Sequence, residues 1–192
     1  MTDKEIIKVL EGRMGAKRFN HSLCVAEEAR RLAQKYGADG DRLYTAGLLH
    51  DITKETSCEE QLKIFSDSAI MLTDIEKGAI KLWHAISGSA YCRTVLGITD
   101  EEILSAIRYH TTAKAGMTKF QKILYIADFT SADRTYPGVG EVRAAADRSI
   151  EEAMAEGLAF TINDLSANKK AIHPDTFEAY NEIMIAEKEV LK

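Results

Sequence analysis

Apolar residues recur along most of the chain at intervals of three and four positions, the spacing of one face of an α-helix. This pattern predicts helices at residues 2–12, 18–36, 41–53, 58–65, 74–85, 87–96, 100–110, 118–131, 139–148, 150–167 and 175–190. Because the chain has only two prolines, Pro137 and Pro174, most helices can run unbroken. The pattern therefore predicts an all-α fold.

Helix start signals support several of these beginnings. In the pattern Ser/Thr-x-x-Glu, the first side chain can accept a hydrogen bond from a free backbone amide, and the glutamate can reach back. The pattern occurs at Ser57 to Glu60, Thr73 to Glu76, Thr99 to Glu102 and Ser149 to Glu152, and Asp175 to Glu178 resembles it. We expect a helix to begin at each of these places.

The stretch "SADRTYPGVG" at residues 131–140 is the clearest irregular loop, because it contains one proline and two glycines. A length of 192 residues fits one compact domain. We therefore expect a single domain over residues 1–192, with a core of about residues 1–131 and a short helical C-terminal part of about residues 139–192.

Composition excludes several classes of protein. The formal net charge of -5 argues against a nonspecific nucleic-acid partner and a membrane-surface role, because both usually require a basic excess. No segment approaches the about 20 apolar residues of a membrane span, and the charged start of the chain is unlike a signal peptide. We expect a cytoplasmic protein. The three cysteines are not spaced as C-x-x-C, so neither a disulfide framework nor a thiolate zinc site is indicated.

Six polar side chains are predicted to point into the helical core. Each lies three, four or seven positions from an apolar residue of its own predicted helix, as His84 follows Ile80 and Asp128 follows Leu124. The six are His21, His50, Asp51, His84, His110 and Asp128. A single buried histidine is more often a hydrogen-bonded core residue than a ligand, and the pair His50-Asp51 is weak evidence alone.

The combination of the six favours a metal site. Burying two carboxylates and four imidazoles without partners would cost several kcal/mol per group, and a divalent ion removes that cost. Imidazole and carboxylate ligands suit Fe, Mn, Co, Ni or Zn, whereas the lack of cysteine ligands argues against structural zinc. With neutral imidazoles the set carries a charge of about -2, so one ion gives neutrality and two would attract a polyanion.

Three basic residues are placed to meet that polyanion. Arg18 lies three positions before His21, Lys54 lies three after Asp51, and Arg134 follows in the loop after the last predicted ligand. Phosphate binding is one interpretation of these positions. Solvation on a charged surface and, for Lys54, an interaction with the helix dipole remain alternatives.

The order His21, His50-Asp51, Asp128 resembles the HD-domain superfamily of metal-dependent phosphohydrolases, in which these four side chains hold the metal. With His84 and His110 added, the pattern resembles the variant whose extra histidines hold a second metal or contact substrate phosphate. Four segments extend the likeness to the YqeK family: "RFNHSLCVAEEA", "HTTAKAGMTKFQKILYIAD", R-x-Y-P-G-V at residues 134–139, and "AIHPDTFEAYN".

This resemblance implies an HD-domain helical bundle with a short helical C-terminal extension. It implies symmetrical cleavage of diadenosine tetraphosphate into two ADP by attack of metal-bound hydroxide. The implied cofactor is a divalent metal, one or two ions, with iron expected first and Mn, Co, Ni or Zn as alternatives. The implied partner is a nucleotide substrate, and a homodimer is left open.

The resemblance also implies roles for individual residues. Asp51 and Lys54 are expected to be catalytic, and substrate contacts are expected from Arg18, Lys54, Thr111, Arg134, His173, Phe177 and Tyr180. His173 has an alternative role as an extended lead-in to a helix beginning at Pro174. The chain departs from the family pattern before Arg134, where Ser131 and Ala132 replace a glutamate-proline pair.

Other functions remain open at this point. The chain could be another HD-type nucleotide phosphohydrolase such as a nucleotidase, or a nucleotide or metal sensor without turnover. The sequence after His110 lacks the Gly-Tyr-Pro motif that follows the histidine in certain cyclic-dinucleotide phosphodiesterases. Lys54 stands at the glutamate position of the pattern H-D-x-x-E-D, which is typical of alarmone hydrolases. A missing ligand would favour a sensor, and none of the expected ligands is missing.

Overall fold

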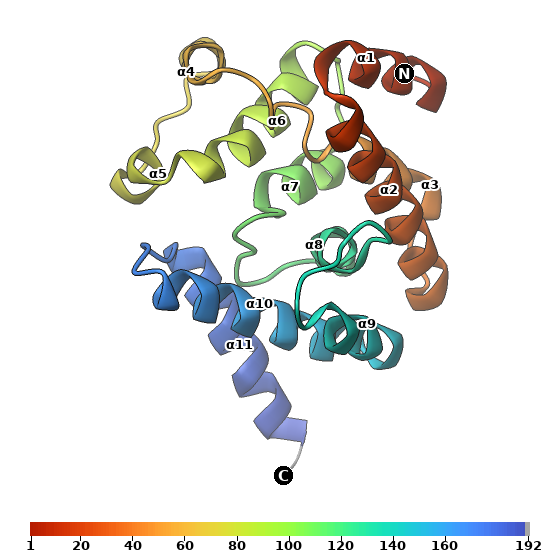
Figure 1. The fold of residues 1–192 in the computed structure, drawn as a ribbon, viewed down its shortest axis with the longest axis vertical. Coiled ribbons are helices and arrows are strands. Elements are labelled where there is room, and N and C mark those ends of the chain that lie inside the picture. Colours follow the sequence, from red (N-terminus) through yellow and green to blue (C-terminus); the bar gives the residue numbers. More distant parts are fainter. Residues whose placement is uncertain (191–192) are drawn as a thin grey trace.

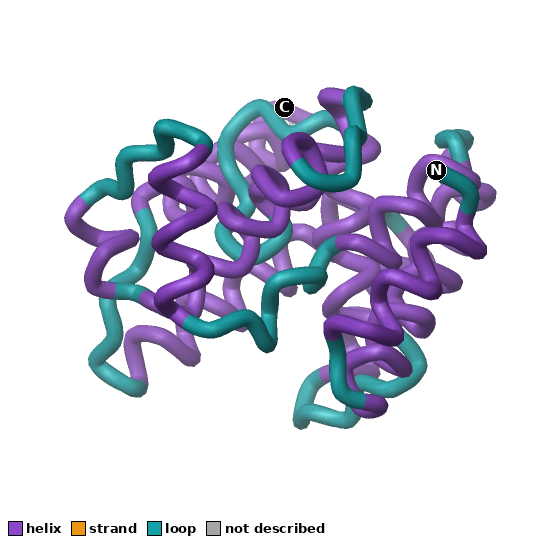
Figure 2. Tube along the Cα trace, turned by 90° about the horizontal axis from the view of Figure 1, so that it is seen from above, coloured by secondary structure: helices purple, strands orange, loops and turns teal. Residues whose placement is uncertain are grey.

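The computed structural model describes residues 1–190, with side chains through residue 186. These residues form eleven α-helices, one short 3-10 helix (η1) and no strand (Figures 1 and 2), which confirms the all-α prediction. The elements are α1 (Asp3–Arg13), α2 (Ala16–Tyr36), α3 (Gly40–Leu49), α4 (Cys58–Asp67), α5 (Asp74–Gly78), η1 (Ile80–Leu82), α6 (Trp83–Thr94), α7 (Glu101–Tyr109), α8 (Lys119–Thr130), α9 (Val139–Arg148), α10 (Ile150–Ala167) and α11 (Pro174–Val190).

Helices α2 and α3 pack together at unusually close range. A Cβ atom built on Gly47 of α3 would lie 2.5 Å from the Cα of Ala26 in α2, so only glycine fits there. Helix α2 also packs against α8, and α3 against α7 and α8. This arrangement brings the end of α3, where His50 and Asp51 follow, close to the buried face of α2 that carries His21.

Capping side chains set most of the helix starts. Ser57 caps α4, Ser149 caps α10, and Thr73 forms a complete capping box with Glu76 at α5. At α7 the cap is Asp100 rather than the predicted Thr99, because the Asp100 carboxylate accepts from the amides of Glu102 and Ile103. An aspartate is as good a cap as threonine, so the predicted start is wrong by one residue.

Two predicted helices end in the wrong place. The predicted helix 41–53 ends at Leu49, and residues 50–56 continue in tight turns, for example from the amide of Lys54 to the carbonyl of Asp51 at 2.8 Å. The predicted helix 74–85 breaks at Ala79, so Ile80 and His84 belong to different elements. Ile80 is consequently half exposed while His84 is buried, and the shared face expected for these two residues is wrong.

The C-terminal helices share the core of the preceding ones. Residues Ile150, Met154 and Leu158 of α10 belong to the same buried cluster as Leu124 of α8. Arg143 of α9 donates to the carbonyl oxygens of Thr130, Ser131 and Arg134 at 2.7–3.0 Å. These contacts join the C-terminal helices to the preceding ones. The single domain over residues 1–192 and its division into a core of about residues 1–131 and a C-terminal part stay predictions.

The membrane prediction can be compared with the helices themselves. Among the described residues, no helix combines the length and the apolar character that crossing a bilayer requires.

Candidate metal centre

The six inward-facing side chains predicted from the sequence converge on one site. They come from α2, the turn after α3, α6, the end of α7, and α8. Three overlapping groups have ligand atoms within 4.8 Å of one another: His21, His50 and Asp51; His50, His110 and Asp128; and Asp51, His84 and His110. Residues more than one hundred positions apart in the chain thus form a single cluster.

Asp51 lies at the middle of this cluster and is almost fully buried. Its Oδ1 atom is 3.1 Å from Nε2 of His84 and 3.5 Å from Nε2 of His110. Its Oδ2 atom is 3.4 Å from Nε2 of His50 and 4.0 Å from Nε2 of His21. Burial would raise the pKa of Asp51, but the neighbouring histidines hold it well below its ordinary value. The charged carboxylate therefore faces both halves of the cluster.

Asp128 lies close to His21 and His50, the two histidines that face Oδ2 of Asp51. Its Oδ1 atom lies 3.0 Å from Nε2 of His21 and 3.9 Å from Nε2 of His50. Burial opposes ionisation of this carboxyl group, yet the close approach of the His21 ring and the charge of Arg134 lower its pKa. Asp128 is therefore a second charged carboxylate in the cluster.

Backbone carbonyl groups orient two of the imidazole rings. Nδ1 of His50 donates to the carbonyl of Gly47, and Nδ1 of His110 to that of Ile107, both at 2.7 Å. In the neutral rings this leaves Nε2 as the free electron-pair donor toward the centre. Burial lowers the pKa of His84 to about 4, so this ring is neutral near pH 7.

The donor set fits a divalent metal ion. Nε2 of His50 and Oδ1 of Asp51 are buried and have no hydrogen-bond partner among the described residues. Unpaired buried acceptors are costly, and nitrogen and carboxylate oxygen ligands suit a divalent transition metal or zinc. No cysteine thiol belongs to any of the three groups in the described part of the chain.

Asp133 is a site residue that the sequence interpretation missed. Its Oδ2 atom accepts from Nδ1 of His21 at 2.8 Å, and its Oδ1 atom accepts from the Ser131 hydroxyl at 2.8 Å. Burial raises the pKa of Asp133, but these two hydrogen bonds leave it below the ordinary value. A carboxylate in this position orients a ligating histidine and makes it more basic. The available signal was the departure of Ser131 and Ala132 from the glutamate-proline pair that the family resemblance implies in this loop. Where the resemblance implies a carboxylate at position 131, this chain has one two positions later, at Asp133.

Three predicted phosphate-binding cations surround the cluster. Arg18 donates to Oδ2 of Asp51 at 2.6 Å, and Lys54 lies 3.0 Å from Nε2 of His84. Arg134 donates to the backbone carbonyl of Asp128 at 2.7 Å and forms an ion pair with its carboxylate. Burial lowers the pKa of Lys54. All three cations are thus within reach of an anion bound at the cluster.

The remaining predicted substrate contacts are dispersed. Thr111 and His173 line one cavity beside the cluster. Tyr180 instead lines a shallow hollow against Glu152 and Ala159 of α10, and Phe177 is substantially exposed. The structure brings the first two together and does not bring the last two to the same cavity, so substrate contacts of Phe177 and Tyr180 stay a prediction.

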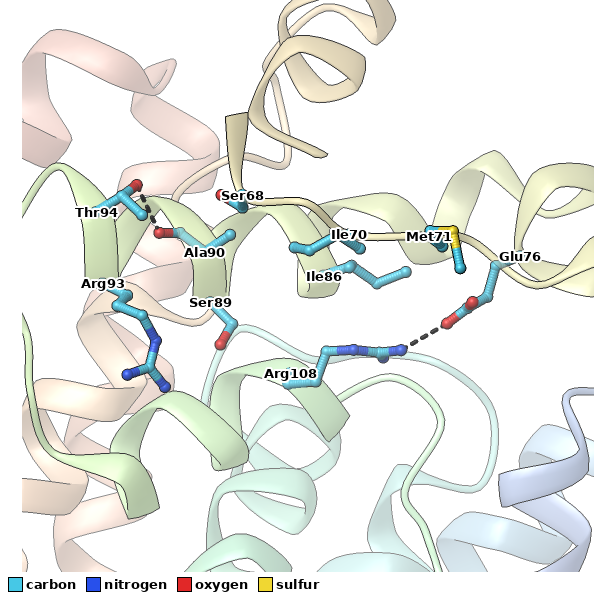
Figure 3. A pocket seen from close by; sticks show the side chains of 10 residues that line it. All are labelled: Ser68, Ile70, Met71, Glu76, Ile86, Ser89, Ala90, Arg93, Thr94 and Arg108. Atoms are coloured by element: carbon cyan, nitrogen blue, oxygen red, sulfur yellow. Dashed lines mark hydrogen bonds and ion pairs between the residues drawn. The ribbon is translucent and has the colours of Figure 1, made fainter. Parts of the chain in front are cut away.

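A further hollow lies between α6, α7 and the segment that joins α4 to α5. Figure 3 shows the Arg108 side chain reaching across it to the carboxylate of Glu76, with Met71 at its edge. None of the predicted site residues lines it. We therefore place the functional site at the histidine-aspartate cluster.

Comparison with known proteins agrees with this placement. The family model described as "HD domain" matches residues 18–133, which span all six clustered side chains and Asp133. The chain therefore belongs to the HD-domain family of metal-dependent proteins.

Particular relatives are similar over nearly the whole chain. The symmetrical bis(5'-nucleosyl)-tetraphosphatase of Bacillus subtilis is 32% identical over 181 residues, covering 94% of this chain and 97% of the relative. The enzyme of the same name from Halalkalibacterium halodurans is 32% identical, covering 98% of this chain and 100% of the relative. The expected resemblance to the YqeK family is confirmed by these relatives.

A solved structure supports the same assignment. It is the crystal structure of a protein described as a predicted HD superfamily hydrolase involved in NAD metabolism, from Clostridium acetobutylicum. The two chains share 33% sequence identity with a TM-score of 0.93, covering 97% of this chain and 98% of the other. The helices of the C-terminal part are therefore common to both proteins.

Proposed function

We propose that this protein is a metal-dependent hydrolase that cleaves diadenosine tetraphosphate symmetrically to two ADP. The names of the relatives, which align with nearly its full length, support this substrate. The observation that carries the proposal is Asp51, whose two carboxylate oxygens face two separate pairs of histidines. Such a carboxylate can serve two adjacent ions, which suits a highly charged polyphosphate.

We assign the first ion to His21, His50, Asp51 and Asp128. His84 and His110, with Asp51, would hold a second ion or contact a substrate phosphate. Iron is the metal that the family resemblance implies first. Mn, Co, Ni and Zn are alternatives, because the mixture of imidazole and carboxylate suits all five metals. A bound divalent ion would supply Lewis acidity toward phosphate oxygens and would lower the pKa of a coordinated water.

The surrounding side chains would bind the substrate phosphates and orient the attacking water. Arg18, Lys54 and Arg134 would bind nonbridging phosphate oxygens, where negative charge is concentrated during phosphoryl transfer. Asp51 would also orient the attacking water by accepting its hydrogen bond. The leaving group, a nucleoside diphosphate, needs little protonation, so no strong general acid is required.

A hydrolysis panel tests the proposal. The purified protein, loaded separately with Fe, Mn, Co, Ni or Zn, is incubated with diadenosine tetraphosphate, and the nucleotides are separated by chromatography. We expect ADP as the sole nucleotide product with at least one metal, and no turnover in the Asp51→Asn variant. Formation of ATP plus AMP, or no cleavage with any metal, contradicts the proposal. Cleavage of only mononucleotides would instead favour a nucleotidase.

A further inference from the structure

Asp51 and His84 lie close together in the cluster, although neither is held in the interior of a helix. Asp51 lies in the tight turns of residues 50–56 after α3. His84 is the second residue of α6, which begins without a side-chain cap directly after η1. Oδ1 of Asp51 is nevertheless 3.1 Å from Nε2 of His84. Contacts between the turn and α6 must therefore fix this distance.

Three buried polar side chains connect the turn to α6. They are Thr53 of the turn, Ser87 of α6 and Gln61 of α4. The Thr53 hydroxyl lies 2.9 Å from the backbone carbonyl oxygen of His84 and 2.8 Å from the Ser87 hydroxyl. Ser87 donates to Oε1 of Gln61 at 2.9 Å, and Nε2 of Gln61 donates to the carbonyl of Thr56 at 3.0 Å. This network of hydrogen bonds thus begins at His84 and returns to the turn.

The donors of the network fit one arrangement. Because Nε2 of Gln61 donates to a carbonyl group, its Oε1 accepts, and the Ser87 proton is used there. The Thr53 proton is then shared between the Ser87 oxygen and the His84 carbonyl oxygen. A shift of the turn along α6 would leave a buried polar group without its partner, which is unfavourable. The network therefore favours a single placement of the turn against α6.

Close packing supports the same placement. A Cβ atom built on Gly88 of α6 would lie 3.3 Å from Oγ1 of Thr53 and 3.6 Å from a methyl group of Ile52, so α6 lies directly against the turn. The turn also contacts the ring of His84, because Nζ of Lys54 lies 3.0 Å from its Nε2. Two consecutive residues of the turn thus contact the backbone and the ring of His84.

We propose that Thr53, Ser87 and Gln61 are positioning residues that set the approach of His84 to Asp51. They act through the backbone of His84 and through the turn, in which Thr53 lies two positions after Asp51. The inference rests on the proposed function, because it concerns the part of the centre to which we assign a second ion or a substrate phosphate.

Nuclear magnetic resonance of the histidine rings tests this proposal in the metal-free protein at constant pH. The signals of His84 are assigned with the variant His84→Gln. Thr53→Val nearly keeps the shape of the side chain and removes its hydroxyl, so it should shift the His84 signals more than those of His21. Thr53→Ser keeps the hydroxyl and should retain the wild-type His84 signals.

Ser87→Ala and Ser89→Ala form a matched pair on the same helix. The Ser89 side chain lines the hollow of Figure 3, and its hydroxyl donates to the carbonyl of Leu104 at 2.8 Å, outside the network. Ser87→Ala should shift the His84 signals, by less than Thr53→Val because Thr53 keeps its bond to the His84 carbonyl. Ser89→Ala should leave them in place.

Turnover provides a second measurement. In the Mn-loaded enzyme, Thr53→Val should lower kcat for diadenosine tetraphosphate about 10- to 100-fold, the usual effect of disturbing a group that orients a metal ligand. Thr53→Ser should restore most of this activity, and Ser89→Ala should retain it. A loss of kcat in Ser89→Ala as large as in Thr53→Val contradicts the proposal.

Wild-type His84 signals in Thr53→Val overturn the proposal, and so do equal shifts in Thr53→Val and Thr53→Ser. If Thr53→Val does not fold, the matched pair decides, and identical His84 signals in Ser87→Ala and Ser89→Ala overturn the proposal. Failure of the proposed function is distinguishable, because it appears in the hydrolysis products of the wild type. The ring signals of the metal-free protein require no substrate.

Discussion

At the scale of single residues, the positions of the imidazole protons determine which ring nitrogens are free to bind a metal ion. The rings of His50 and His110 direct their protons to backbone carbonyl groups, whereas His21 directs its Nδ1 proton to the carboxylate of Asp133. A carboxylate withdraws a proton more strongly than a carbonyl group, so Nε2 of His21 becomes the more electron-rich donor. Asp133 would therefore orient the candidate ligand His21.

We predict that Asp133→Ala weakens metal binding about 10- to 100-fold, the usual effect of removing such a carboxylate. Competition with a chelator of known affinity, followed by metal analysis, measures the change. The double variant Ser131→Glu, Asp133→Ala returns a carboxylate to the place given by the family pattern, and it should recover part of the affinity. Unaltered affinity in Asp133→Ala would show that the hydrogen bond to His21 has no such role.

At the scale of elements, the close contact of α2 and α3 sets how the centre is assembled. Gly47 lies three residues before His50, and its missing side chain allows the backbone of α3 to lie against Ala26. His21 and His50 are thereby held with their ring centroids 5.3 Å apart. The spacing of these two candidate ligands thus depends on a residue that has no side chain.

We predict that Gly47→Ala destabilises the protein by about 1–3 kcal/mol or more, because the added methyl group must push two helix backbones apart. Gly12→Ala in α1 is the matched control, since a Cβ there meets nothing within 4 Å. Alanine is the better helix former, so Gly12→Ala should be neutral or stabilising by up to about 1 kcal/mol. Urea unfolding of both variants measures the difference, and equal stabilities would refute the packing argument.

How much the sequence could predict also depends on the element. His21 and Asp128 lie within helices, where the helical period places them correctly on the face that turns toward the cluster. His50, Asp51 and His110 follow helix ends, and there the direction of a side chain depends on the turn and not on the period. Contacts such as that of His21 with Asp133, 112 positions away, depend on how loops pack, which no local pattern contains.

At the scale of the whole molecule, the metal centre joins five parts of the fold. Its candidate ligands span positions 21 to 128, so an ion held by His21, His50, Asp51 and Asp128 would connect α2, the turn after α3 and α8, and a second ion would add α6 and the end of α7. The unfolded chain cannot present these groups together, so an ion should bind the folded protein selectively. Metal binding should therefore contribute to global stability as well as to catalysis.

We predict that the melting temperature rises with added metal. At a free concentration 100 times the dissociation constant, one site contributes about 2.7 kcal/mol, which corresponds to about 5–10 °C for a chain of this size. Thermal denaturation of chelator-treated and metal-loaded protein measures the shift, and Asp51→Asn should show little of it. Identical melting curves with and without metal would mean that these residues bind no ion in the folded state.

The three hydrogen bonds of Arg143 have a consequence for the modularity of this fold. They join α9 to the carbonyl groups of Thr130, Ser131 and Arg134. Asp133, which forms the hydrogen bond with His21, lies in the same segment. A fragment ending after α8 would retain all six candidate ligands and lose this anchor. The minimal unit that can be transplanted into another protein is therefore expected to extend beyond the loop and to include the helices that follow it.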